Sequence, residues 1–314
     1  MKTAANVLSW RAGTTPGPTD QNSQKSGVSH HVTGSLRRWT DAWPKKLAPV
    51  RSWNTKRLRR VRGRVLLGRM TLYAIGDIHG HIDLLRAAHD LVEADRAREG
   101  TGGADLVHLG DLVDRGPDSA GVVAFLMQSQ TDDPRIKVLK GNHDRLLHWF
   151  LEQTPRIDTQ LRSDLNYLSG SMGGMTTLAS YGVDISLSAA EIHRQARSLV
   201  PKAHIAFLIG LPVMHQSTGC VCVHAGIRPG VPFNAQTEDD LLWIRRAFLD
   251  DPRDHGALVV HGHTPRDSPE HFGNRLNLDS GAAFGGPLSV VAIEDHVAFL
   301  LTDRGRVKIP VQRR

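Results

Sequence analysis

The sequence has little cysteine and no long hydrophobic run. Its two cysteines, Cys220 and Cys222, stand two positions apart in GCVCVHAG. Strand residues with this spacing point to the same face, and such neighbours rarely meet disulfide geometry. With no further cysteine, a zinc site built on thiolates is excluded as well. We expect two small core residues of a protein in a reducing compartment, the cytoplasm. No apolar stretch approaches the roughly 20 residues that a membrane-spanning helix needs.

Acidic residues are scarce in the first part of the chain. Residues 1–69 hold two of the 32 acidic residues and 15 of the 39 basic residues, so this segment carries a net charge of +13. The rest holds 30 acidic and 24 basic residues and carries −6, although the whole chain carries +7. The basic charge therefore belongs to the first segment. The remainder gives no electrostatic reason to expect nucleic-acid binding.

Residues 1–69 also lack the apolar stretch of a secretion signal and any sustained helix or strand period. They are rich in Ser, Thr, Gly, Pro and Arg and contain the basic run KRLRRVRGR at 56–64. We expect a disordered extension. Its composition also resembles an organelle transit peptide. Two further hypotheses are that translation starts at Met70 and that the segment recruits nucleic acid or an anionic membrane.

From residue 70 onward, short apolar strands alternate with amphipathic helices. The pattern predicts strands at 71–75, 105–109 and 135–139, and helices at 81–96, at 118–128 and from about His143. This order predicts a parallel sheet with helices packed on its faces, an α/β architecture.

The second half of this region has a different pattern. Residues 145–212 are mostly helical in periodicity, with a glycine-rich break at SGSMGGMT, so we expect a largely helical insert. Strands return at 219–223, 257–261, 288–293 and 296–301. We therefore expect one catalytic domain over residues 70–314.

A polar motif follows each of five predicted strands. In chain order the motifs are GDIHG at 76–80, GDLVDRG at 110–116, GNHD at 141–144, HAG at 224–226 and HGHT at 261–264. Ligands bind at the carboxyl ends of strands in open α/β sheets. We therefore expect one rim to gather six side chains: Asp77, His79, Asp111, Asn142, His224 and His263.

Carboxylate, imidazole and amide ligands without thiolate suit manganese, iron or zinc. Six candidates exceed the needs of one tetrahedral ion. They suit two ions about 3.5–4 Å apart that share a carboxylate, an arrangement that catalyses in-line displacement at phosphate esters. Each motif alone is also explained as a polar turn, a helix cap or a satisfied buried histidine. Their joint occurrence at strand ends favours the metal site.

The five motifs, in this order, resemble those of the phosphoprotein phosphatase family of calcineurin-like metallophosphoesterases. The bacterial and phage serine/threonine protein phosphatases look most similar, and the resemblance covers about residues 70–300. It implies an αββα sandwich fold. It also implies two divalent metal ions, with manganese as the usual ion and iron or zinc as alternatives.

The resemblance implies a role for each metal ligand. Asp77 and His79 would bind the first ion, and Asp111 would bridge both ions. The second ion would be bound by Asn142, His224 and His263.

The same resemblance implies four catalytic residues. His143 would protonate the leaving alkoxide, and Asp114 would orient it and hold it as an imidazolium. Arg115 would bind the phosphoryl oxygens. A second arginine of this kind is expected in the run LWIRR, where we prefer Arg245 to Arg246.

Three positions depart from the family pattern. Asp144 stands where glutamate is usual, and its shorter carboxylate still suits a helix cap. Ser280, in the segment LDSGA, stands where threonine is commoner, and we interpret that segment as structural. His261 has no ligand role in the family, and we expect an ordinary strand-end side chain.

The expected activity is hydrolysis of phosphoserine and phosphothreonine in proteins, with phosphotyrosine as a further substrate, by attack of a hydroxide that bridges the two ions. The alternative is hydrolysis of dinucleoside polyphosphates such as diadenosine tetraphosphate, by an enzyme of the same superfamily. GNHD favours the alternative. Asp114 favours phosphomonoesters, because the dinucleotide enzymes typically have alanine there and a serine alkoxide needs an acid to leave.

Two further expectations concern partners. A catalytically inactive module that binds phosphopeptides would lack a metal ligand, and this chain has all six. We expect phosphoprotein or small phosphoester substrates and no requirement for nucleic acid.

Overall fold

The computed structural model describes residues 71–217 and 219–312. The expected extension at 1–69 and the proposed start at Met70 lie outside these residues. The described part contains two β-sheets.

The first sheet has the strand order β11-β10-β9-β1-β2-β3. Strands β1, β2 and β3 run parallel, with Ile75 opposite His108 and His108 opposite Val138, so their carboxyl ends are aligned. The other strands pair antiparallel on the far side of β1. The bounds are β1 Thr71–Ile75, β2 Leu106–His108, β3 Ile136–Val138, β9 Val290–Glu294, β10 Val297–Thr302 and β11 Gly305–Lys308.

The second sheet has the order β4-β5-β6-β8-β7. Here β5, β6 and β8 run parallel, with Cys222 opposite Val260 and His261 opposite Asn277. The bounds are β4 Met214–Ser217, β5 Cys220–Val223, β6 Leu258–His261, β7 Glu270–His271 and β8 Arg275–Asn277.

Each helix lies between two of these strands in the sequence. Those of the first half are α1 Ile82–Glu99, α2 Ser119–Asp132, α3 Asn142–Phe150, α4 Gly174–Ser180, α5 Ala189–Leu199 and α6 Lys202–Gly210. Shorter elements follow in the second half: the 3₁₀ turns η1 Phe233–Ala235 and η2 Ala282–Phe284, and the helices α7 Glu238–Trp243 and α8 Arg246–Leu249.

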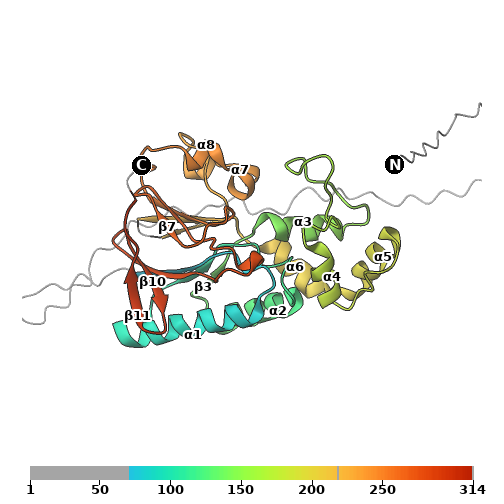
Figure 1. Ribbon diagram of the computed structural model, residues 1–314, viewed down its shortest axis with the longest axis horizontal. Coiled ribbons are helices and arrows are strands. Elements are labelled where there is room, and N and C mark those ends of the chain that lie inside the picture. Colours follow the sequence, from blue (N-terminus) through green and yellow to red (C-terminus); the bar gives the residue numbers. More distant parts are fainter. Residues whose placement is uncertain (1–70, 218, 313–314) are drawn as a thin grey trace, which may run out of the picture. The chain divides into compact units, whose positions relative to one another are not determined.

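The alternation of side chains along each strand produces four layers. On β1, Leu72 and Ala74 face the second sheet and pack in one cluster with Cys222. Tyr73 and Ile75 face the opposite way, toward apolar residues of α1 and α2. The outer face of the second sheet packs under α7 and α8, as Figure 1 shows. The order helix, sheet, sheet, helix confirms the predicted αββα sandwich.

The segment predicted as a largely helical insert is helical in part. Helices α4, α5 and α6 lie within it, whereas residues 151–173 form turns and bends. The short strands β4, β7, β8 and β11 were not predicted, because β4, β7 and β11 carry polar or charged residues and none of the four forms a continuous apolar run. Among the described residues, no helix has the length and hydrophobicity needed to cross a membrane.

The burial of both cysteines gives a testable prediction. Cys220 and Cys222 are free thiols at 4% and 0% exposure between the two sheets. Burial raises the pKa of Cys220 to about 11, so its reactive thiolate is scarce at neutral pH. A thiol-titrating disulfide reagent should react slowly with the native protein and with both thiols at once in guanidinium chloride. Rapid reaction of the native protein would contradict the buried placement.

Candidate active site

The predicted ligands come together at one rim formed by both sheets. Asp77 and His79 follow β1, Asp111 follows β2, and Asn142 begins α3 directly after β3. From the second sheet, His224 follows β5 and His263 follows β6. None of the six is more than 6% exposed. The carboxyl ends of five strands therefore deliver all six side chains to one buried place.

Asp111 joins two clusters of potential metal ligands. One cluster is His79, Asp111 and His143, and the other is Asp111, His224 and His263; in each, the ligand atoms lie within 4.8 Å of one another. Asp111 Oδ2 lies 3.4 Å from His79 Nε2, and Asp111 Oδ1 lies 3.4 Å from His224 Nε2. The two oxygens of one carboxylate thus face two different sites.

Backbone carbonyls fix the orientation of two imidazoles. His79 Nδ1 lies 2.9 Å from the carbonyl oxygen of Val113, and His224 Nδ1 lies 3.0 Å from that of Leu109. A carbonyl oxygen only accepts, so each Nδ1 carries the proton and donates it. Each Nε2 is left with a lone pair directed into the site, the arrangement typical of metal-binding histidines.

The atoms around His224 Nε2 fit a cation. Asn142 Oδ1 lies 2.9 Å away and His263 Nδ1 lies 3.2 Å away. The oxygen and Nε2 of His224 are both acceptors, so their approach is stabilised when a positive ion lies among them. Asp77 Oδ1 and His263 Nε2 are buried without a hydrogen-bond partner in the described structure. Buried polar atoms are rarely left unpaired, and a cation in the site would give Asp77 Oδ1 a partner.

The electrostatics of the site also favour bound cations. Burial lowers the pKa of His79, His224 and His263, so these imidazoles are neutral and able to bind metal. Burial raises the pKa of Asp77, and the carboxylates of Asp279 and Asp111 raise it further. A divalent cation relieves this repulsion between carboxylates.

The backbone at the site adopts conformations that side chains usually avoid. His79, Asp111, Asp114, Arg115 and His263 all have positive φ, between 47° and 75°. Such residues cost on the order of 1 kcal/mol or more each and persist only where surrounding contacts hold them. These turns are how three of the five motifs, GDIHG, GDLVDRG and HGHT, aim their side chains inward.

One glycine is required by close approach to a ligand. A Cβ on Gly262 would lie 1.9 Å from Asp77 Oδ1, so a side chain there would displace that carboxylate. Glycine before His263 therefore lets the ends of β1 and β6 meet.

His143 has the surroundings of a positioned acid. Its Nδ1 lies 2.6 Å from Asp114 Oδ2, and both side chains are buried. Asp114 Oδ1 accepts hydrogen bonds of 2.8 Å from the hydroxyls of Tyr167 and Thr177. The predicted pairing of His143 with Asp114 is present, and two residues of the segment after α3 hold the carboxylate in place.

Two arginines line the cavity, which measures about 200 Å³. Arg115 Nη1 lies 2.7 Å from His79 Nε2, and its Nη2 lies 3.0 Å from His143 Nε2. Both Arg245 and Arg246 are exposed, but Arg245 lines the cavity and Arg246, the first residue of α8, does not. The preferred arginine of the predicted pair is thus the one at the cavity.

Asp144 holds the loop that carries Asp111. Its Oδ2 accepts a hydrogen bond from the Gly141 amide at 2.7 Å, and its Oδ1 accepts one from the Leu112 amide at 2.9 Å. The shorter carboxylate caps α3 as expected and also ties that helix to the loop after β2. His261, by contrast, packs against Phe248.

Asp279 is a cavity residue that the sequence analysis interpreted as structural. It follows β8, lines the cavity, and accepts a hydrogen bond from the Gly281 amide at 3.1 Å. Burial raises the pKa of Asp279 to about 6, and nearby Asp111 adds to this effect. An aspartate and a glycine just after an apolar run, as in the first two motifs, were the signal that could have identified it.

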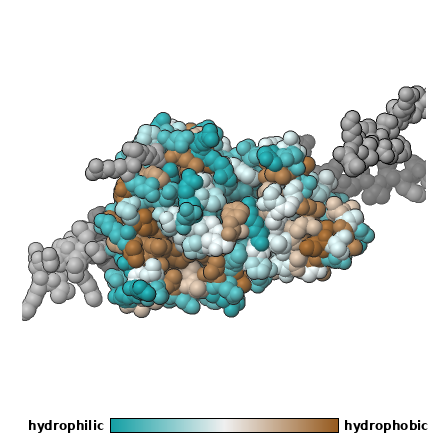
Figure 2. All heavy atoms as spheres, in the orientation of Figure 1, coloured by the Kyte–Doolittle hydropathy of each residue, from teal (hydrophilic) through white to brown (hydrophobic). Residues whose placement is uncertain are grey.

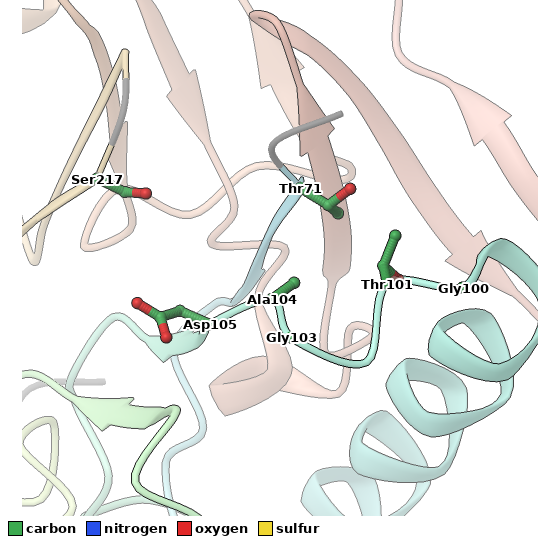
Figure 3. A pocket seen from close by; sticks show the side chains of 7 residues that line it. All are labelled: Thr71, Gly100, Thr101, Gly103, Ala104, Asp105 and Ser217. Atoms are coloured by element: carbon green, nitrogen blue, oxygen red, sulfur yellow. The ribbon is translucent and has the colours of Figure 1, made fainter. Parts of the chain in front are cut away.

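A separate hollow of about 350 Å³ lies at the opposite end of β1 (Figure 3). It is lined by Thr71, Thr101, Asp105, Ser217 and small neighbouring residues. It contains none of the predicted site residues.

Comparison with known proteins agrees with this site. The family model described as calcineurin-like phosphoesterase matches residues 70–292. The chain therefore belongs to the calcineurin-like phosphoesterase family and is a metal-dependent phosphoesterase. The two clusters that share Asp111 are consistent with a dinuclear metal site.

Curated relatives fall into two groups. A bis(5'-nucleosyl)-tetraphosphatase PrpE, asymmetrical, of Anoxybacillus flavithermus is 27% identical over 69% of this chain and 88% of its own length. Serine/threonine-protein phosphatase 1 of Salmonella typhimurium is 26% identical over 71% of this chain and 92% of its own length.

Solved structures share the fold. A putative diadenosine tetraphosphatase has a TM-score of 0.50 at 21% identity and covers 78% of this chain and 96% of its own. The cold-active protein-tyrosine phosphatase of a psychrophilic Shewanella species has a TM-score of 0.52 at 16% identity and covers 77% of this chain and 81% of its own.

The shared carboxylate predicts how variants bind metal. We expect the manganese-reconstituted protein, after desalting, to retain about two ions per chain. His263→Asn should retain about one, because its site loses an imidazole, and Asp111→Asn should lose ions from both sites. Mass spectrometry of the metal content measures this.

His204→Asn, on α6 and away from the cavity, is the matched control, and circular dichroism reports whether each variant is folded. Full retention of both ions by folded Asp111→Asn would contradict the shared-ligand geometry.

Proposed function

We propose that this chain hydrolyses dinucleoside polyphosphates and cleaves a tetraphosphate asymmetrically, to a nucleoside monophosphate and a triphosphate. The observation that carries the proposal is that the cavity has positively charged side chains in addition to the metal ligands. Arg115 and Arg245 both line the same cavity, so cationic groups are available for more than one phosphate. The Anoxybacillus relative, 88% of whose length this chain covers, supports the same substrate class.

Each site residue has a task in this proposal. The first ion would be held by Asp77 and His79, the second by Asn142, His224 and His263, with Asp111 on both. When bound, such ions lower the pKa of water and neutralise charge on the phosphoryl group.

The remaining residues act on the substrate itself. Arg115 and Arg245 donate hydrogen bonds to phosphate oxygens and orient the phosphate chain of the substrate for in-line attack. His143 Nε2 faces the cavity and delivers a proton to the leaving oxygen, while Asp114 holds the ring by its Nδ1–H.

A second candidate is a phosphomonoesterase acting on phosphoserine and phosphothreonine in proteins. The close, buried contact between His143 and Asp114 favours it. A nucleotide is a good leaving group, whereas a serine alkoxide is a poor one and depends on a positioned acid. The Salmonella relative is named for this activity.

A direct competition separates the two candidates. We expect the manganese-loaded full chain to have a kcat/KM on diadenosine tetraphosphate at least about tenfold above that on a phosphoserine peptide, and to release AMP and ATP. Ion-exchange chromatography identifies the products. A higher kcat/KM on the peptide would establish the second candidate instead, and two molecules of ADP would rule out asymmetrical cleavage.

Asp114→Asn is the matched test of the acid within the same experiment, because asparagine tolerates the positive φ at this position. Its loss of kcat should be about 10²-fold or more on the phosphoserine peptide and much smaller on the dinucleotide. Equal losses on both substrates would contradict the expectation that the poorer leaving group depends more on protonation by His143.

A further inference from the structure

A second cavity lies against the active-site cavity. It measures about 430 Å³, and we name it the side pocket. Its walls come from α3, from residues 155–168 and from the first two turns of α5. Leu161 lines both the side pocket and the cavity of the metal ligands, so the two spaces share a wall. The two spaces are therefore adjacent at Leu161.

The walls of the side pocket suit a flat ring. The rings of Phe150 and Tyr167 lie 4.9 Å apart at 32°, and the ring of His193 meets Phe150 edge-on at 5.3 Å. Phe150 and Tyr167 are each 6% exposed, so they are held by packing before a ligand arrives. Aromatic walls of this kind favour a stacked or edge-on aromatic ligand over an aliphatic one.

Tyr167 connects the side pocket to the chemistry. Its ring lines the pocket, and its hydroxyl donates to Asp114, the partner of His143. The segment that carries it is also anchored to α3, because buried Asp158 accepts hydrogen bonds from Arg145 Nε and Nη2 at 3.1 and 2.6 Å. The wall of the pocket is thus fixed relative to His143, two residues before Arg145.

Polar and charged groups lie at the rim of the pocket. Asn166 offers a side-chain amide, whose Oδ1 accepts from the Leu168 amide at 2.9 Å. Arg156 contributes a cation that lies over the ring of Trp149, with 4.2 Å to the ring centroid. Ile157 is 71% exposed at the same rim. Figure 2 shows hydrophobic patches both over the helical region around α4 and α5 and over the part of the molecule formed by the sheets.

We propose that the side pocket binds a nucleobase of the substrate, with the phosphate chain running across Leu161 to the metal ligands. The inference rests on the proposed function and names the part of the molecule that recognises the nucleoside. Three features favour this occupant: the aromatic walls, a volume within the range of small-ligand pockets, and the shared wall with the phosphate-binding cavity. An apolar peptide side chain next to a phosphoserine is the competing occupant.

Ala190→Trp tests the proposal, because Ala190 lines the pocket from an exposed position on the first turn of α5. In the manganese-loaded full chain, we expect this variant to lower kcat/KM on diadenosine tetraphosphate by about tenfold or more, mainly through KM. On p-nitrophenyl phosphate, which has no nucleoside, kcat/KM should change by less than about twofold. Ser198→Trp is the matched control on the same helix, exposed and outside the pocket, and should change neither value.

Binding of adenosine alone provides a readout without turnover. Magnetisation transfer from the protein to the adenine protons should occur in the wild type and in Ser198→Trp, and should be lost in Ala190→Trp. Absence of transfer in the wild type would overturn the inference.

The outcomes also separate this inference from the proposed function. If the wild type cleaves the dinucleotide and Ala190→Trp is unimpaired, the function stands and the pocket is wrongly assigned. If adenosine binds the pocket but the dinucleotide is not cleaved, the proposed function fails and the binding site stands. If Ala190→Trp impairs only a phosphoserine peptide with an apolar neighbour, the competing occupant is correct.

Discussion

The structure depends on one buried carboxylate that faces two sites. Asp111 directs one oxygen toward His79 and the other toward His224, each at 3.4 Å. Burial disfavours its charged form, but the His143 amide donates a hydrogen bond of 2.9 Å to its Oδ1, which favours the ionised carboxylate. The carboxylate is therefore ionised where it is needed as a shared ligand.

The spacing of the site follows from the packing of the sheets. The first sheet contributes Asp77, His79, Asp111 and Asn142, and the second contributes His224 and His263. The apolar cluster between the sheets fixes how far apart these two groups lie. Because protein interiors are close-packed, a change of one side chain in this cluster moves one set of ligands relative to the other.

Much of the site was predictable because its signals are local. Each candidate ligand stands within a few residues of a short apolar run, so strand ends and polar motifs predicted six ligands at one rim, and the family resemblance added His143 and Arg115. The fold class followed from the alternation of strands and helices. The serine/threonine phosphatase activity expected first has less support from the relatives than the dinucleotide alternative.

The residues that were missed act over long sequence separations. Tyr167 and Thr177 reach Asp114 from positions 53 and 63 residues away, and no periodicity reports such a contact. Asp279 follows β8, a strand of three residues that carries no recognisable period. The side pocket is likewise formed by turns at 151–173, where a helical pattern was expected.

The most direct test of the shared carboxylate is electron paramagnetic resonance of the manganese-loaded protein. Two ions that share Asp111 would lie close enough for their spins to couple, since paired metal sites hold their ions about 3.5–4 Å apart. We predict the spectrum of a coupled pair at full loading. A spectrum of isolated ions at every loading would contradict the account, because Asp111 would then hold one ion and the two clusters would not form one site.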